Sequence, residues 1–219
     1  MLGLSLHSKR RVAVRALLAS LFCGVALCAG ASPVATAVSL GSRISPELKR
    51  ALLANVQEQG PYRLTPERRA LLNTIRYAEG TWTDGEDQGY RTLYGGGQFQ
   101  DLSRHPERVV VRRYSSAAAG AYQFLPSTWK GLAKELRLSS FEPRYQDQAA
   151  LHLVKRRGAL GEIDSRGLTR TAMARLAPEW ASFPTRSGRS AYGQPVKSHR
   201  ELVRFYEDNL KQLKDQLGA

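Results

Sequence analysis

The chain has 219 residues, of which 42% are hydrophobic and 24% are charged, so it can hold one folded domain with an extension. Its formal net charge of +14 predicts attraction to polyanionic surfaces. The basic residues are scattered and accompany no recognisable nucleic-acid motif, so we do not expect nucleic acid as a partner.

Residues 1–37 have the pattern of an export signal. Four basic residues lie among residues 9–15, residues 16–31 carry no charge, and cleavage sites of the A-x-A type end at Ala31 and Ala37. The apolar run is shorter than the roughly 20 residues of a membrane span, so we expect cleavage and only transient contact with the membrane. A retained signal anchor is the alternative, and either outcome predicts a periplasmic or extracellular protein.

Both cysteines, Cys23 and Cys28, lie in this signal, and cleavage at either site leaves a chain without cysteine. Disulfides, cysteine metal sites and thiol nucleophiles are therefore not expected. The four histidines show no metal-ligand spacing, so the sequence predicts neither a metal nor a cofactor.

Residues 38–65 are interpreted as a linker that carries one short helix. Ser45 and Pro46 suit the first positions of a helix, and Gly60 followed by Pro61 suits its end. The domain, residues 66–219, begins after this linker.

The first helix of the domain is predicted over residues 66–79, after a Thr-Pro pair that begins at Thr65. At about 100° per residue, Glu79 lies about 20° from the direction of Leu72 and shares the apolar face of Ile75. The Glu79 carboxyl therefore points toward the expected core, directly before Gly80.

A carboxyl at that position is costly to ionise, because lost hydration and the unpaired carbonyls of a helix C-terminus both favour its protonated form. Glu79 is thus a candidate general acid. The alternative is an ordinary glutamate that turns outward or pairs with Arg76.

A small antiparallel sheet is predicted next, from residues rich in glycine, aromatic and β-branched types. We expect strands over 90–94 and 98–102 around a turn at 95–97, and a further β-branched run at 109–111. Helices are then expected over 126–136, 143–157, 168–176 and 198–217. The order of helix, sheet and helices predicts an α+β domain of two lobes with a cleft between them.

Several blocks of this chain occur in the order and spacing of a known family. They are YAEG from Tyr77, GYRTLYGGGQFQDLSRHP from Gly89, SSAAAGAYQF from Ser115, LSSFEPRYQDQAALHLVKRRGAL from Leu138, EWASFP from Glu179 and AYGQ from Ala191. Over residues 66–196 the chain resembles the bacteriophage lambda endolysin-like lytic transglycosylases. The resemblance implies a lysozyme-like, mainly helical α+β fold with a small antiparallel sheet lobe.

The resemblance also implies an activity, which is cleavage of the β-1,4 bond between N-acetylmuramic acid and N-acetylglucosamine in peptidoglycan. The glutamate that matches Glu79 is the family's acid and then its base, and the muramic acid C6 hydroxyl attacks C1 to leave a 1,6-anhydro end. A nucleophile already near C1 needs no positioned water, so a second carboxylate is dispensable. We expect a monomer that acts on glycan strands.

Four residues are candidates for substrate binding. Tyr122 can stack on a sugar face, and Gln123 offers a donor and an acceptor to an acetamido group or the C6 hydroxyl. Tyr192 and Gln194 lie in a glycine-bearing loop, where a tyrosine hydroxyl could orient the acetamido group. Core or loop packing is the alternative for both tyrosines.

Most glycosidases use two carboxylates, so a hydrolytic muramidase of the same fold is the second hypothesis. Asp84, Glu86, Asp87 and Asp101 are the possible second carboxylates, although acids in a glycine-bearing loop more often form a solvated turn. The third hypothesis is a cationic cell-wall-binding protein without catalysis, against which Glu79 argues.

Overall fold

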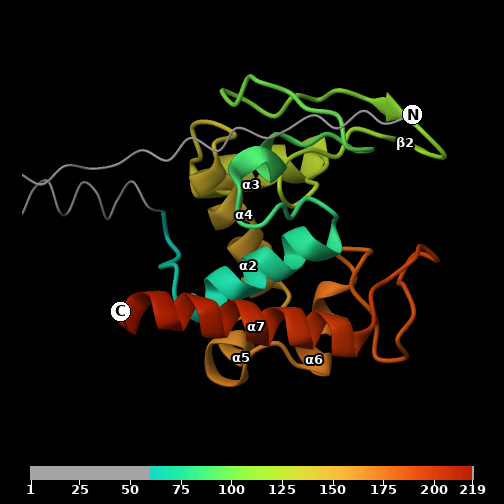
Figure 1. Cartoon of the computed structure of the whole chain (residues 1–219). Helices are drawn as coiled ribbons and strands as arrows, with labels where there is room; N and C mark the ends of the chain where they lie inside the picture. The colour runs from blue at the N-terminus through green and yellow to red at the C-terminus, as the bar shows by residue number, and fades with distance from the viewer. Residues whose placement is uncertain (1–59, 219) are drawn as a thin grey trace, which may run out of the picture. The chain divides into compact units, whose positions relative to one another are not determined.

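The computed structural model describes residues 60–218, so the expected export signal and the helix expected before Gly60 lie outside the described residues. This part of the chain forms six α-helices, one 3-10 helix and a two-stranded antiparallel sheet, in the order shown in Figure 1. The mainly helical α+β composition predicted from the sequence is therefore confirmed.

Helix α2 spans Pro66–Ala78 and begins and ends as its sequence predicts. The Thr65 side chain accepts a hydrogen bond from the Arg68 amide at 3.3 Å, which satisfies one of the free N–H groups of the first turn. Leu72 and Ile75 are completely buried on the face that carries Glu79. The core face of α2 thus lies where the helical periodicity places it.

The predicted strands over 90–94 and 98–102 are corrected by the structure. A 3-10 helix, η1, spans Asp87–Arg91, and a single bridge between Thr92 and Gln98 replaces the expected ladder. The 3-10 helix takes up the start of the first expected strand. The rest of that stretch also bonds to a third segment, because the amide of Tyr94 donates to the carbonyl of Ala118 at 2.8 Å and the amide of Gly120 donates to that of Thr92 at 2.8 Å.

The regular sheet lies in the next stretch of the chain. Strand β1, Val110–Val111, pairs antiparallel with β2, Ser115–Ser116, and Val110 is opposite Ser116. The predicted β-branched run at 109–111 therefore does contain a strand. Its hairpin extends at the top of the view in Figure 1, away from helix α7.

Helices α3, Pro126–Leu136, and α4, Pro143–Arg156, agree closely with their predicted ranges. Both carry a proline in their first turn, where the missing N–H needs no intrahelical partner. Ala149 to Leu151 in α4 are fully buried, so α4 is a central element of the core.

Helix α5, Leu160–Arg166, was not expected, and α6 spans Arg170–Leu176 rather than 168–176. Helix α5 has seven residues and no side-chain cap at its N-terminus, so its sequence carries few helical signals. Its Ile163 is completely buried, which indicates that tertiary packing stabilises this helix.

Helix α7, His199–Gly218, packs along α2, as Figure 1 shows. The ring of Tyr77 stacks on that of Phe205 with centroids 4.1 Å apart, and the side chain of Asn73 donates to that of Asn209 at 2.7 Å. Among residues 60–218, no helix has both the length and the apolar character that a membrane span requires.

A buried carboxylate in α4 joins α2 to the two segments that precede α3. Asp147, 3% exposed, pairs with Arg69 at 2.8 Å and accepts hydrogen bonds from the hydroxyls of Tyr90, at 2.8 Å, and Tyr122. Burial and the neighbouring Asp147 raise the pKa of Tyr90 to about 12, so its hydroxyl keeps its proton and remains a donor. This cluster links elements that are far apart in the sequence.

We expect Asp147→Asn to lower the free energy of unfolding by about 3 kcal/mol, because it removes the buried carboxylate that the part-buried Arg69 and the hydroxyls of Tyr90 and Tyr122 all contact. Urea denaturation measures this loss. The matched control is Asp164→Asn, which breaks the more exposed pair with Arg68 and should cost about 1 kcal/mol or less. Equal losses in the two variants would contradict the central role of the Asp147 cluster.

Candidate functional site

Glu79 is the C-cap residue directly after α2 and is half-buried. The chain leaves the helix through Gly80, whose φ of +72° lies in the left-handed region. The amide of Gly80 donates to the carbonyl of Tyr77 and the amide of Thr81 donates to that of Arg76, which is the hydrogen-bond pattern of a Schellman C-cap. This turn sets the direction in which the chain continues past Glu79.

Three hydrogen bonds bring three distant segments together around this turn. The hydroxyl of Ser182 donates to the Glu79 carboxyl at 2.5 Å, and the hydroxyl of Thr81 donates to the carbonyl of Ala121 at 2.6 Å. The indole of Trp180 donates to the carbonyl of Tyr122 at 3.2 Å. One site is therefore formed by three segments, residues 77–81, 120–124 and 179–183, although more than half of the domain's sequence lies between the first and the last of them.

Burial raises the pKa of Glu79 from 4.5 to about 7. The hydrogen bond from Ser182 acts in the opposite direction, since it favours the ionised carboxylate, but the loss of hydration is the larger effect. A carboxyl with a pKa near neutrality can donate a proton and then accept one under the same conditions. This is the property that the sequence position of Glu79 suggested.

The alternative pairing of Glu79 with Arg76 does not occur in the structure. The Arg76 guanidinium lies between the rings of Trp82 and Tyr90, 4.9 Å and 4.7 Å from their centroids, and donates to the carbonyl of Glu86 at 2.6 Å. Arg76 is thus occupied by aromatic and backbone partners, so the cationic residue nearest in sequence does not lower the pKa of Glu79.

Gln123 lies beside the site in a strained backbone conformation, with φ of +48°. Its amide nitrogen donates to the carbonyls of Gly120, at 3.0 Å, and Thr92, at 3.2 Å. These bonds fix the side chain and leave its amide oxygen as the group that a sugar could meet. Its expected contact with substrate stays a prediction.

Tyr122 does not have the exposed ring that sugar stacking requires. It is 1% exposed, its hydroxyl donates to Asp147, and burial raises its pKa well above the usual value. Its carbonyl instead accepts the bond from Trp180. We therefore assign Tyr122 to the framework of the site and withdraw it from the substrate-binding candidates.

Tyr192 and Gln194 lie in an exposed loop that is attached to the site segment. Tyr192 is 61% exposed and its hydroxyl donates to the carbonyl of Pro178 at 2.8 Å. The hydroxyl of Ser190, in the same loop, donates a hydrogen bond to the carbonyl of Ala181, which is next to Ser182. The loop therefore borders the segment that holds Glu79, and a role of both side chains in glycan binding remains a prediction.

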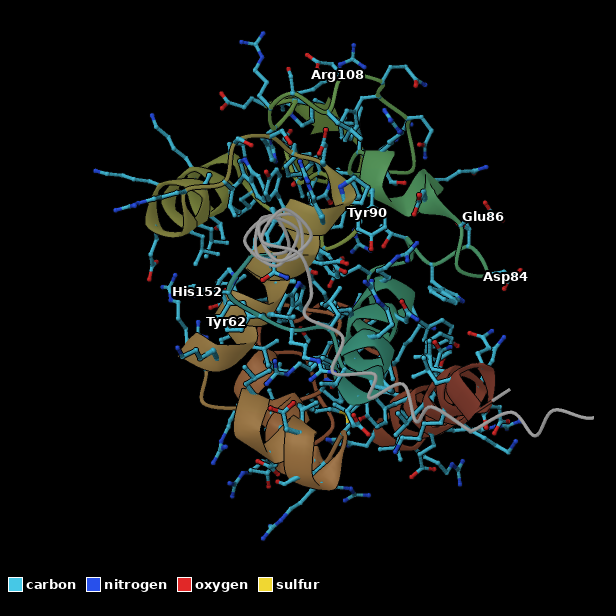
Figure 2. All side chains as sticks on the ribbon, turned by 90° about the vertical axis from the view of Figure 1, so that its left-hand side faces the viewer. Tyr62, Asp84, Glu86, Tyr90, Arg108 and His152 are labelled. Carbon is cyan, nitrogen blue, oxygen red and sulfur yellow. The ribbon has the colours of Figure 1, made fainter. Side chains whose placement is uncertain are left out.

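The four possible second carboxylates are exposed, and none has a contact with Glu79 among the described residues. Asp84 and Glu86 lie at the outer end of a loop in Figure 2. Asp84 and Asp87 line a cavity of about 560 Å³ whose lining does not include Glu79. Asp101 accepts a hydrogen bond from the amide of Ser103 at 2.8 Å, and the side chain and then the amide of Ser103 lower the pKa of Asp101.

Sequence reasoning missed Ser182 and Thr81 as residues of the site. Ser182 lies within the motif EWASFP and Thr81 directly follows the motif YAEG. This position in the family motifs was the signal that could have identified them. Their roles depend on contacts between distant segments. Within residues 60–218, no group of three or more His, Cys, Asp or Glu side chains could hold a metal ion.

Comparison with known sequences identifies similar proteins for most of the described chain. Residues 69–213 match the family described as Endolysin. The endolysin of Escherichia phage lambda is 38% identical over 147 residues, which cover 65% of this chain and 90% of the phage protein. The endolysin of Escherichia phage P2 is 34% identical over 148 residues, which cover 61% and 87%.

Solved structures show the same relationship. The bacteriophage lambda lysozyme complexed with a chitohexasaccharide matches with a TM-score of 0.61 and 34% identity, over 68% of this chain and 97% of that chain. A second structure, lysozyme from bacteriophage lambda, matches with a TM-score of 0.58 and 32% identity, over 70% and 97%. The lysozyme-like fold predicted from the sequence is confirmed.

We expect the stability of the protein to depend on pH through Glu79. Because its pKa is about 7 in the folded protein and 4.5 in an ordinary glutamate, the folded chain holds a proton that the unfolded chain releases. The resulting stabilisation is complete below pH 4.5 and is lost as the pH rises through 7. Its total is about 3 kcal/mol at about 1.4 kcal/mol per pKa unit.

Glu79→Gln should therefore gain stability relative to wild type as the pH rises from 4.5 to above 7. Urea denaturation of both proteins across this range measures the difference. Asp101→Asn, at an exposed carboxyl, is the control and should show no such gain. A difference between Glu79→Gln and wild type that does not vary with pH would exclude a raised pKa.

Proposed function

The chain belongs to the endolysin family, and from this membership we propose that it is an exported lytic transglycosylase. The endolysin and lysozyme relatives indicate an enzyme, a glycosidase that cleaves peptidoglycan. The finer proposal is that it cleaves the β-1,4 bond between N-acetylmuramic acid and N-acetylglucosamine and leaves 1,6-anhydromuramic ends. The half-buried Glu79, with its pKa near 7, is the observation that supports this proposal most directly.

In the first step, protonated Glu79 gives its proton to the glycosidic oxygen, and the bond from this oxygen to C1 of the muramic acid breaks. Positive charge then develops at C1 and the ring oxygen. Ser182 donates to the carboxylate that remains, which stabilises the ionised form of Glu79 during this step.

In the second step, the C6 hydroxyl of the same sugar attacks C1 and its proton passes to the Glu79 carboxylate. The 1,6-anhydro ring closes, no water is consumed, and Glu79 regains its starting state. A nucleophile that belongs to the substrate needs no second carboxylate to position it, so Glu79 alone can serve the proposed reaction. The pKa near 7 allows one side chain to serve in both steps.

The hydrolytic muramidase is the alternative reaction on the same fold. It would use a second carboxylate about 5 to 5.5 Å from the first for retention, or about 6.5 to 9.5 Å for inversion. The exposed positions of Asp84, Glu86, Asp87 and Asp101 favour the transglycosylase. A purely wall-binding protein would not need a carboxyl whose ionisation is this unfavourable.

The proposed substrate groove passes Glu79 and the side chains that border it. Gln123 and the loop of Tyr192 and Gln194 are the proposed contacts to the acetamido groups. The lambda lysozyme structure that contains a chitohexasaccharide supports an N-acetylated glycan as the ligand. We further propose that residues 1–37 direct export of a monomer to the compartment where peptidoglycan lies.

Digestion of purified peptidoglycan tests the reaction. We expect mass spectrometry to detect anhydro-muropeptides, each one water lighter than the corresponding reducing product, because the C6 hydroxyl replaces water as the nucleophile. Reducing ends alone would show that the enzyme is the hydrolytic muramidase. Absence of any cleavage by a folded protein would exclude both reactions.

A series of amide substitutions tests the number of carboxylates. Glu79→Gln should lower the rate of cleavage about 10²- to 10⁴-fold, which is the usual contribution of a general acid or base. The substitutions Asp84→Asn, Glu86→Gln, Asp87→Asn and Asp101→Asn should each retain the rate within a few-fold and serve as matched controls. A loss in one of these four as large as that in Glu79→Gln would identify a second catalytic carboxylate.

A further inference from the structure

The projecting β1–β2 hairpin exposes apolar side chains on both sides of its turn. Val109, Val111 and Tyr114 are 64%, 70% and 58% exposed. Because successive side chains of a strand point to opposite faces, Val110 packs toward the core while Val109 and Val111 point outward. Apolar side chains that gather on one exposed segment mark an interaction surface.

The same segment is strongly cationic. Residues 108–114 contain Arg108, Arg112 and Arg113 and no acidic residue. All three arginines are exposed, and within residues 60–218 none of them forms an ion pair. The guanidinium of Arg113 lies 5.5 Å from the centroid of the Tyr114 ring. We call residues 108–114 the hairpin tip, and its charge favours an anionic partner.

Hydrogen bonds hold the residues that precede the hairpin tip. His105, which is buried, contacts the carbonyl of Phe124 at 2.9 Å and accepts a hydrogen bond from the amide of Glu107 at 3.0 Å. The amide of Arg112 donates to the carbonyl of Tyr114 at 3.0 Å and closes the turn. Figure 2 shows Arg108 at the outer edge of the molecule, far from the labelled His152 and Tyr62.

We propose that the hairpin tip docks the protein on an anionic phospholipid surface. Aliphatic side chains enter the boundary between headgroups and acyl chains, tyrosine is favoured at the same depth, and arginines pair with lipid phosphates. The tip combines these three types within seven residues. This surface is additional to the proposed cleavage of peptidoglycan, and neither proposal depends on the other.

A glycan strand is a poorer match for this tip. Sugar faces stack on aromatic rings, and the tip offers one such ring, Tyr114, beside the aliphatic Val109 and Val111. The glycan backbone also offers little charge to three arginines. Nucleic acid would supply phosphates but would leave both valines without an apolar partner. The combination of charge and aliphatic surface therefore favours lipid.

Sedimentation of the full chain with vesicles tests the proposal. We expect binding to vesicles of phosphatidylcholine mixed with phosphatidylglycerol, and weak binding to phosphatidylcholine alone. A variant with Arg108→Gln, Arg112→Gln and Arg113→Gln should bind the anionic vesicles on the order of 100-fold more weakly, because each arginine near the surface contributes about fivefold.

The matched control has Arg156→Gln, Arg166→Gln and Arg200→Gln, three exposed arginines of α4, α5 and α7. It has the same net charge as the hairpin variant, and its affinity for anionic vesicles should fall only a few-fold. Equal losses in the two variants would show a general charge effect and overturn the proposal. A variant with Val109→Ser, Val111→Ser and Tyr114→Ser should keep the dependence on salt but bind about tenfold more weakly.

Hydrogen exchange locates the contact directly, which matters because residues 1–59 are present in every variant. Anionic vesicles should slow exchange in residues 108–114. Protection confined to residues 1–59, or protection of the tip by lipid-free glycan strands but not by vesicles, would overturn the proposal. Cleavage of lipid-free peptidoglycan by all three variants reports separately on the proposed enzyme activity.

Discussion

The loss of water around one carboxyl is the constraint on which the site depends. A pKa change of Glu79 from 4.5 to about 7 corresponds to about 3 kcal/mol of disfavoured ionisation. The C-terminal position in α2 acts in the same direction, since the free carbonyls there repel a negative charge. Ser182 limits the effect by donating to the carboxyl, so the group stays close to the pH at which it can exchange protons. A fully solvated glutamate would remain ionised and could not begin the proposed reaction.

That environment exists only because three segments are held against each other. Thr81 and Trp180 bond to carbonyls of the 120–124 segment, and Ser182 bonds to Glu79. Helix α4 also holds the 120–124 segment. The side-chain oxygen of Gln146 accepts a hydrogen bond from the amide of Ala121 at 2.9 Å, and Asp147 accepts one from the hydroxyl of Tyr122. The buried polar side chains of Gln146 and Asp147 thus form hydrogen bonds with the segment that they position. These bonds attach the site to the core.

The outcomes along the chain show where pattern reading succeeds. The 3.6-residue period and the Thr-Pro and Gly signals place α2 and Glu79 correctly, because both depend on neighbours within one helix. The strands expected at 90–94 and 98–102 form only one bridge, because residues 87–91 are a 3-10 helix and Thr92 and Tyr94 also bond to Gly120 and Ala118. Tyr122 and Gln123 are adjacent in the sequence, yet one is a core residue and the other lies half-buried at the site. A helical or strand pattern could not separate them.

The amino-acid sequence by itself determined most of the helices, the family and the position of Glu79 at the end of the core face of α2, since these follow from local periodicity, capping residues and ordered motifs. The tertiary structure alone decided that Ser182 binds this carboxyl, that Arg76 turns to Trp82 and Tyr90, and that the acids after Glu79 stay in solvent. The physical reason is that desolvation and hydrogen bonding act through space. The pKa of a side chain depends on every group that surrounds it. Here those groups come from segments that are far apart in the sequence, so local sequence patterns do not predict their contact.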